Sequence, residues 1–110
     1  MDKEAANILS PDLRYVGGFS QFRKIAVLGE LAGLEVIPHD GVVGVLHAML
    51  SQPPYLCPIG EYLLRSSQRN QALYKEGFYP VKGTLKLPNK PGLGLEINED
   101  IITSRRYLEF

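Results

Sequence analysis

The amino-acid sequence predicts an α/β fold in which parallel strands alternate with helices. Two observations lead to this prediction. Short apolar runs recur along residues 6–63, and each run ends at a turn signal and is followed by a stretch with helical character. Strands that alternate with helices of about ten or more residues indicate βαβ units and a parallel sheet, and the crossovers in such units are right-handed. Residues 77–110 lack this rhythm and predict an extended arm.

The first unit begins with the apolar run 6–10. We expect a strand that ends at Pro11, because proline is excluded from the interior of a central strand. Gly17-Gly18 indicates a loop, and Ser20 is a candidate cap for the helix that follows. One helix face is predicted from residues that recur with a 3.6-residue period, namely Phe22, Ile25, Ala26, Gly29 and Ala32. Gly33 is the expected C-terminal cap.

The second and third units repeat this order. The run 34–37 predicts a strand ended by Pro38, and a helix over about 42–52 is stopped by Pro53-Pro54. The third strand is expected at 58–63, before a polar helix near 67–75. In the arm we expect extended chain around 81–87 and 93–97, joined by a tight turn at 88–92.

Three residues with acid–base chemistry occupy equivalent places in this rhythm. Asp12, His39 and Glu61 each follow or lie near the end of a predicted parallel strand, and ligands bind at that edge of α/β sheets. His39 suits a general base because its ordinary pKa, roughly 6.5, is near working pH. Asp12 could accept the proton of one ring nitrogen and fix the tautomer. Glu61 could hydrogen-bond a developing enolate or donate a proton.

Other interpretations of these residues stay open. An isolated Asp, His or Glu at a strand end is more often a cap or a satisfied polar group. His47 is expected to be a packed structural histidine and Cys57 a small buried hydrophobe. Surface solvation is the expectation for the arginines that could otherwise meet a substrate carboxylate, namely Arg65, Arg69, Arg105 and Arg106. No tight cluster of carboxylates suggests a Mg²⁺ site within the chain.

The charge balance excludes several classes of partner. Twelve basic and twelve acidic residues give a formal net charge of zero, whereas nucleic acids and acidic membranes attract a surplus of Lys and Arg. A single cysteine rules out an intramolecular disulfide, and the polar start shows no secretory signal. We therefore expect a cytoplasmic protein that binds neither nucleic acid nor membrane.

The residues also resemble those of a known family. Residues 10–20, followed by 24–26 and 31–33, resemble the sixth strand, loop and helix of the mandelate racemase branch of the enolase superfamily. Residues 36–39 and 59–62 resemble its seventh and eighth strands, and 87–96 its C-terminal segment. The resemblance implies an incomplete (β/α)₈ TIM-barrel segment, with the last three βα units in residues 1–76 and an arm, 77–110, that packs on the capping domain.

Within that branch, residues 80–87 and the spacing from His39 to His47 are most similar to L-rhamnonate dehydratase-like sugar-acid dehydratases. The resemblance implies a Mg²⁺-dependent loss of water after proton abstraction next to a carboxylate. It makes His39 the base, Asp12 its orienting partner and Glu61 a hydrogen-bond partner of the substrate or enediolate. The Mg²⁺ ligands of the family lie on earlier strands, outside this chain. Asp40 departs from the family, which often places glycine or another small residue there.

Three strands cannot close an eight-stranded barrel, whose interior is filled from all sides. We expect the chain to be inactive alone, and either to self-associate or to pair with a chain that supplies the missing strands. Alternatives stay open: a non-catalytic remnant that acts only in assembly, or part of a racemase or epimerase of the same branch.

Overall fold

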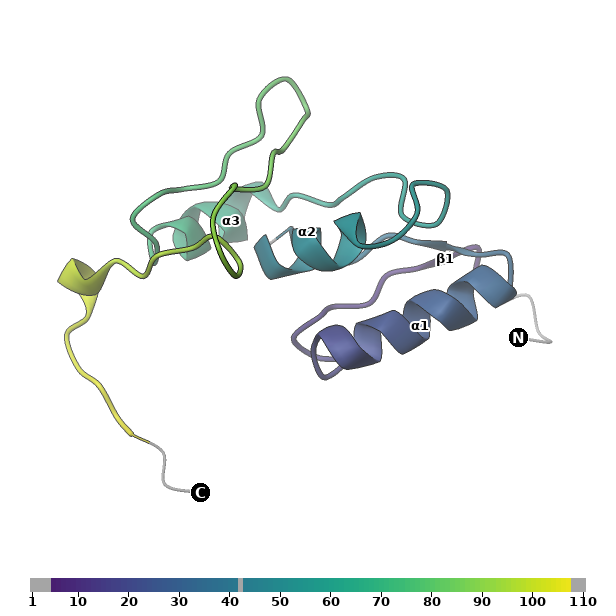
Figure 1. Ribbon diagram of the computed structural model, residues 1–110, viewed down its shortest axis with the longest axis horizontal. Coiled ribbons are helices and arrows are strands. Elements are labelled where there is room, and N and C mark those ends of the chain that lie inside the picture. The colour runs from purple at the N-terminus through teal and green to yellow at the C-terminus, as the bar shows by residue number, and fades with distance from the viewer. Residues whose placement is uncertain (1–4, 42, 108–110) are drawn as a thin grey trace.

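The computed structural model describes residues 5–41 and 43–107, and its regular elements are short (Figure 1). In chain order they are β1 (Ile8–Leu9), α1 (Phe19–Leu31), β2 (Glu35–Val36), α2 (Val43–Leu50), α3 (Leu64–Gln71) and a 3₁₀ turn, η1 (Glu99–Ile101). The order β–α–β–α matches the predicted alternation for the first two units.

The two strands run parallel and stay side by side beyond their formal ends. Leu9 lies opposite Val36 in the ladder, and an isolated parallel bridge pairs Asp12 with His39. The His39 N–H donates to the Pro11 carbonyl at 3.1 Å. Because of this continued pairing, the segments that carry the two candidate acid–base residues leave the sheet together.

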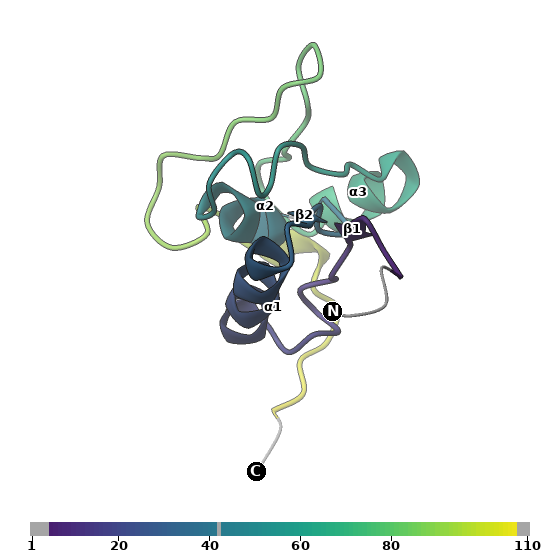
Figure 2. The same cartoon turned by 90° about the vertical axis from the view of Figure 1, so that its right-hand side faces the viewer.

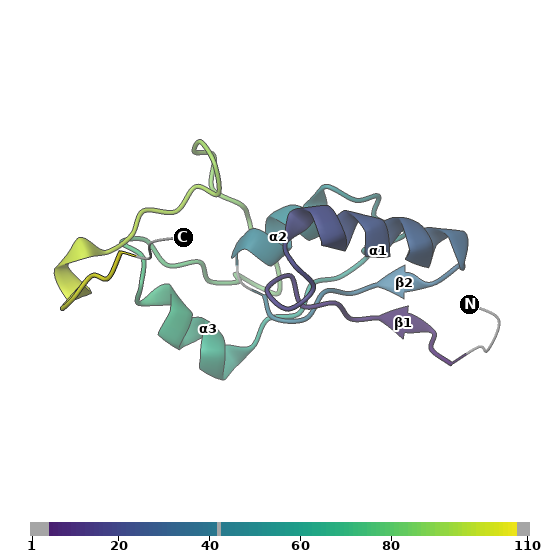
Figure 3. The same cartoon turned by 90° about the horizontal axis from the view of Figure 1, so that it is seen from below.

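Helix α1 packs along the strand pair, as Figure 3 shows. It buries Phe22, Ala26 and Gly29 of the predicted face, whereas Ile25 is half-buried and Ala32 is exposed. Val36 of β2 is fully buried beneath the helix. A Cβ on Gly29 would lie 2.7 Å from Cγ2 of Val36, so the helix backbone approaches the strand as closely as glycine permits. This contact is the centre of the core.

The ends of α1 test two predicted caps. Gly33 has φ 67°, and the Leu34 N–H donates to the Gly29 carbonyl while the Gly33 N–H donates to that of Glu30. This is the expected glycine C-terminal cap. The predicted Ser20 cap is wrong, because the helix begins at Phe19 after Gly18, and no side chain caps it. Gly17 and Gly18, both with positive φ, turn the chain into the helix two residues earlier than a Ser20 cap would.

The third predicted strand is not a strand in the structure. Residues 58–63 form no ladder, although the Val36 N–H donates to the Leu56 carbonyl at 2.8 Å beside them. Pro58 has no N–H to donate, which removes one ladder bond. Gly41 packs so tightly on this segment that a Cβ would lie 3.0 Å from Cα of Tyr62. The segment therefore runs beside β2 without joining the sheet, and α3 begins at Leu64, earlier than predicted.

The arm folds back on the end of α3 (Figure 2). Tyr74 and Ile97 form an antiparallel bridge, and the Asn98 N–H donates to the Leu73 carbonyl at 2.8 Å. The turn predicted at 88–92 lies slightly later in the chain, because the Gly94 N–H donates to the Pro91 carbonyl at 3.1 Å and Gly92 adopts φ 65°. The predicted extended stretches of the arm form only isolated bridges rather than strands.

The molecule is less compact than a closed domain of its length. Its radius of gyration is 15.8 Å, whereas a compact domain of this size would have about 13 Å. Over the described ranges, β2 is the only strand neighbour of β1, and large apolar side chains stay exposed, among them Leu31 at 80%. No helix within residues 5–41 and 43–107 has the length and apolar character needed to cross a membrane.

Candidate acid–base site at the strand ends

The three predicted site residues come from three neighbouring segments. The bridge between Asp12 and His39 fixes the first two side by side at the ends of β1 and β2. Glu61 belongs to the segment that runs beside β2, where Gly41 holds its backbone in close contact. The expectation of a shared strand edge holds for the placement of Asp12 and His39, whereas Glu61 comes from a segment that forms no ladder and runs beside β2.

The His39 ring and Glu61 form the contact with the clearest chemistry. Nδ1 of His39 lies 2.6 Å from Oε2 of Glu61, and both side chains are partly exposed. The same Oε2 accepts the backbone N–H of Asp40 at 2.9 Å. A carboxylate this close to Nδ1 favours the tautomer with its proton on that nitrogen. The arrangement can thus leave Nε2 free to face a substrate.

Asp12 has a different partner from the one predicted. Its carboxylate accepts the backbone N–H of Arg14 at 2.8 Å, Nε at 3.3 Å and Nη2 at 2.9 Å. These hydrogen bonds lower the pKa of Asp12 and keep it ionised. Glu61, and not Asp12 as expected, lies against the His39 ring. Arg14 binds the Asp12 carboxylate instead, because its guanidinium group and its backbone N–H reach both oxygens at once.

Sequence reasoning about the site did not find Asp40 as a contact residue. Asp40 is 1% exposed, adopts φ 65° and pairs its Oδ2 with Nη2 of Arg14. Through Arg14 it is linked to Asp12, and through its N–H to Glu61. The signal in the sequence was its place directly after His39, where a charged residue departs from the family pattern.

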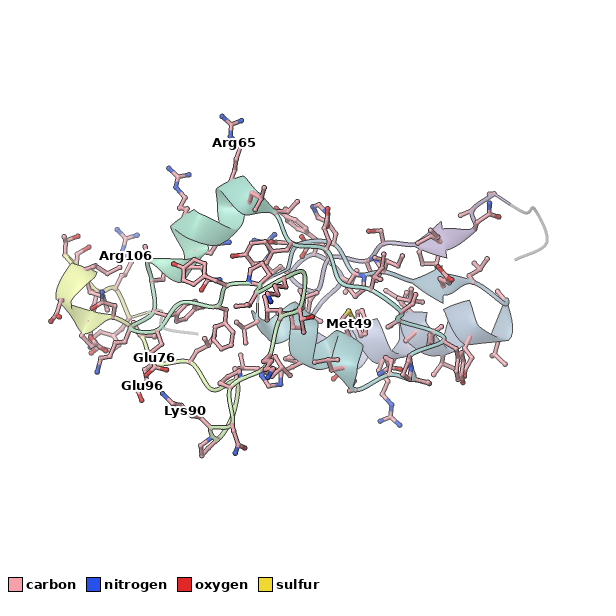
Figure 4. The ribbon with its side chains drawn as sticks, turned by 90° about the horizontal axis from the view of Figure 1, so that it is seen from above. Met49, Arg65, Glu76, Lys90, Glu96 and Arg106 are labelled. Carbon is pink, nitrogen blue, oxygen red and sulfur yellow. The ribbon has the colours of Figure 1, made fainter. Side chains whose placement is uncertain are left out.

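The remaining candidates behave as structural or surface residues. Nε2 of the half-buried His47 lies 3.1 Å from the Leu93 carbonyl, which ties α2 to the arm. Cys57 is buried, and that burial raises the pKa of its thiol. Arg65 points away from α3 into solvent in Figure 4, and Arg105 pairs with Glu99 on the surface. None of these side chains joins the strand-end site.

The residues present do not fit a magnesium ion. Among residues 5–41 and 43–107, no group of three His, Cys, Asp or Glu side chains could hold a metal. The two buried carboxylates nearest the site already share one guanidinium, that of Arg14. A second cation there would meet its positive charge at short range. The acidic groups elsewhere are exposed ion pairs, such as Lys90 with Glu76 and Glu96 (Figure 4).

The chain is similar to a protein family and to several known proteins. The profile of the family described as "Enolase C-terminal domain-like" matches residues 1–101. The chain is 37% identical over 113 residues to D-galactarolactone cycloisomerase from Agrobacterium fabrum, covering 93% of this chain and 30% of that protein. It is 33% identical over 102 residues to a putative L-rhamnonate dehydratase from Caldivirga maquilingensis, covering 87% and 25%.

A solved structure is similar as well. L-Talarate dehydratase from Polaromonas sp. JS666, crystallised with Mg and L-glucarate, matches with a TM-score of 0.68 and 33% identity. The match covers 87% of this chain and 25% of that one. The chain therefore spans between a quarter and a third of the length of these relatives.

Proposed function

The chain belongs to the enolase C-terminal domain-like family, and we propose that it is the C-terminal part of a sugar-acid dehydratase that carries the acid–base residues of the site. The observation that carries this proposal is the contact of His39 Nδ1 with Oε2 of Glu61 at 2.6 Å, which favours a proton on Nδ1 and leaves Nε2 free. The names of the similar dehydratases support the substrate class.

In the proposed reaction, Nε2 of His39 removes the proton from the carbon next to the substrate carboxylate. The electron pair of that C–H bond forms a double bond to the neighbouring carbon, and the hydroxyl group there leaves as water with the proton that the His39 imidazolium returns to it. Glu61 stabilises the imidazolium in between, because its carboxylate lies 2.6 Å from Nδ1. Asp12 keeps the role of positioning His39 through the paired strand ends rather than through a direct bond to the ring.

Magnesium enters this proposal only from outside the chain. The family and the Mg in the talarate dehydratase structure suggest the ion, whereas the carboxylates described here do not fit it. Its ligands would lie in the part of the relatives that this chain does not span. No step above is assigned to the ion.

The proposal is tested by completing the barrel. The chain is combined with the N-terminal region of a dehydratase of the family, in buffer with Mg²⁺, and sugar acids are assayed for conversion to keto acids. Turnover that needs both parts supports the proposal, and His39→Asn should lower it by about 10²-fold or more, the lower end of general acid–base contributions. Arg65→Gln is the matched surface control and should leave turnover unchanged. Full turnover with His39→Asn would sink the assignment of the base.

A second candidate function is a non-catalytic remnant that acts only in assembly. It is favoured by the poor fit of the described carboxylates to magnesium. Complementation without turnover on any sugar acid would support it. A racemase or epimerase function would instead give a stereoisomer of the substrate without loss of water, which product analysis distinguishes.

We also propose that the chain assembles, either with itself or with a chain that supplies further strands. The exposed edge of β1 and the large extent, 50 × 43 × 27 Å, support this, since unpaired strand edges and apolar surface favour association. In a completed barrel the arm, 77–110, would pack on the capping domain. A monodisperse monomer that unfolds cooperatively would contradict the assembly proposal. The expected cytoplasmic location stays a prediction.

A further inference from the structure

We infer that Asp40 is a positioning residue of the acid–base site. Its backbone N–H holds Glu61 against the His39 ring, and its carboxylate pairs with Arg14 and thereby fixes the backbone turn at Asp40. The inference rests on the proposed function for the role of His39, and it concerns a residue that the family resemblance left without a role.

The backbone of Asp40 provides the first step. At φ 65° it adopts the left-handed conformation, which few residues other than glycine, asparagine and aspartate visit. This conformation directs the Asp40 N–H to Oε2 of Glu61 at 2.9 Å. The same oxygen lies 2.6 Å from Nδ1 of His39. The Glu61 oxygen thus accepts the Asp40 N–H and lies against the His39 ring, and its position favours the Nδ1–H tautomer of the ring.

The side chain of Asp40 provides the second step. It is 1% exposed, and its Oδ2 pairs with Nη2 of Arg14, which also holds Oδ2 of Asp12 at 2.9 Å. Its Oδ1 is buried without a hydrogen-bond partner in the part of the chain that the structure describes. Burying a charge with half its acceptor capacity unused costs stability, and glycine would give the same turn without that cost. Fold stability alone therefore does not explain an aspartate here.

Together these contacts form one continuous path across the site. It runs from Asp12 to Arg14, from Arg14 to the Asp40 carboxylate, and from the Asp40 N–H to Glu61 and the His39 ring. Asp40 joins the Asp12–Arg14 pair to the Glu61–His39 pair, because its side chain contacts Arg14 and its backbone N–H contacts Glu61. The loop after β1 is thereby connected to the base at the end of β2.

The two histidines of the chain allow a direct test by NMR. In a sample labelled with ¹⁵N-histidine, the ring nitrogens report which one carries the proton. At about pH 8, above the ordinary histidine pKa, we expect His39 to carry it on Nδ1, facing Glu61. His47 should carry it on Nε2, facing the Leu93 carbonyl. His47 lies on α2, away from the path, and serves as the reference within the same spectrum. His47→Gln assigns the two sets of signals.

The variants separate the backbone from the carboxylate. Asp40→Ala disfavours the left-handed turn and removes the anchor, and it should lower the ratio of Nδ1–H to Nε2–H tautomer at His39 by about fivefold, the worth of one hydrogen bond. Asp40→Asn tolerates the turn and keeps an acceptor for Arg14, so it should restore the ratio to within about twofold of the parent. The His47 signals should stay unchanged in both.

Three results would overturn the inference: an unchanged His39 ratio in Asp40→Ala, equal loss in Asp40→Asn, or parallel changes at His47. If Asp40→Ala does not fold, Asp40→Gly replaces it, because glycine adopts the turn without strain and lacks only the anchor. An Asp40→Gly ratio equal to that of the parent would then refute the role of the carboxylate. These readouts do not depend on turnover, so they stand apart from the His39→Asn test of the proposed function.

Discussion

Gly41 offers a sharp test of how the third segment is held beside β2. In Gly41→Ala the new Cβ would overlap the Glu61 carbonyl oxygen and lie 3.0 Å from Cα of Tyr62 and 3.1 Å from C of Glu61. The overlap with that oxygen is the most severe, because ordinary contacts of a carbon atom lie at about 3.5–4.0 Å and the new Cβ would be far inside that range. The Glu61 backbone would therefore have to move away by roughly 1–1.5 Å. These neighbours are backbone atoms, which cannot rotate aside.

Both the fold and the site should register that shift. Overpacking of this kind costs about 1–3 kcal/mol, measured as a lower free energy of unfolding in urea followed by circular dichroism. The contacts of Glu61 Oε2, now 2.6 Å to His39 Nδ1 and 2.9 Å to Asp40 N, would stretch toward about 3.5 Å and weaken as hydrogen bonds. The His39 ring should then lose its preference for the Nδ1–H tautomer.

Gly44→Ala is the matched control for this experiment. Its Cβ would meet Cδ2 of Leu13 at 3.6 Å and Cζ of Phe19 at 3.9 Å, ordinary van der Waals distances. Because alanine also favours the helix by up to about 1 kcal/mol, Gly44→Ala should be as stable as the parent or more stable. The reasoning fails if Gly41→Ala unfolds at the same urea concentration as Gly44→Ala with the His39 signals intact.

Three further predictions concern the core, the cap and the acid limb of stability. Phe22→Ala should lower the free energy of unfolding by about 3–5 kcal/mol, since Phe22 is 2% exposed. Leu31 is exposed, so Leu31→Ala should change the free energy of unfolding by less than about 0.5 kcal/mol. Equal effects of the two substitutions on unfolding in urea would contradict the described core. Gly33→Ala should cost about 1–2 kcal/mol, because φ 67° is strained for a residue with a Cβ, and unchanged stability would contradict the cap. Arg14 lowers the pKa of Asp12 below its ordinary value of roughly 3.9, so the folded state binds fewer protons than the unfolded one and gains stability as pH rises through that range. Asp12→Asn should therefore make the loss of stability between about pH 4 and pH 2 shallower, and an acid limb as steep as that of the parent would contradict the pairing.

Much of the barrel-type rhythm could be predicted from local signals. The periodicity of Phe22, Ala26 and Gly29 predicted the buried face of α1, and Gly33 predicted its end, because helix burial and glycine caps depend on nearby residues. Pro11 and Pro38 placed the ends of the first two strands, whereas no proline directly follows the third run. The start of α1 was missed because Gly17 and Gly18 together turn the chain, and a serine cap is only one of several ways to begin a helix.

The third strand could not be predicted correctly because ladder formation is not a local property. Residues 58–63 have an apolar pattern, but a strand needs hydrogen-bonding neighbours, and Pro58 removes one donor. The segment is held beside β2 by one backbone hydrogen bond, from the Val36 N–H to the Leu56 carbonyl, and by the close backbone contact with Gly41. It forms no ladder. Pattern and propensity describe what a segment can form, and the surroundings decide what it does form.

The site shows the same limit. The positions of Asp12, His39 and Glu61 at neighbouring segment ends follow from the strand–helix order. The partners of these side chains do not follow from it. Arg14 binds the Asp12 carboxylate, and the His39 ring therefore lies against Glu61 rather than Asp12. Asp40 was missed as a contact because its left-handed turn and its burial arise only in the folded chain.

The central claim, that this chain carries the base of a sugar-acid dehydratase, is tested most directly by hydrogen exchange at the substrate carbon. With the barrel completed and the reaction run in D₂O, proton removal by His39 predicts deuterium in the recovered sugar acid at the carbon next to the carboxylate. A substrate deuterated at that carbon should lose its deuterium when the reaction is run in H₂O. His39→Asn should abolish this exchange, while Arg65→Gln should retain it. Exchange that persists undiminished in His39→Asn would contradict the account.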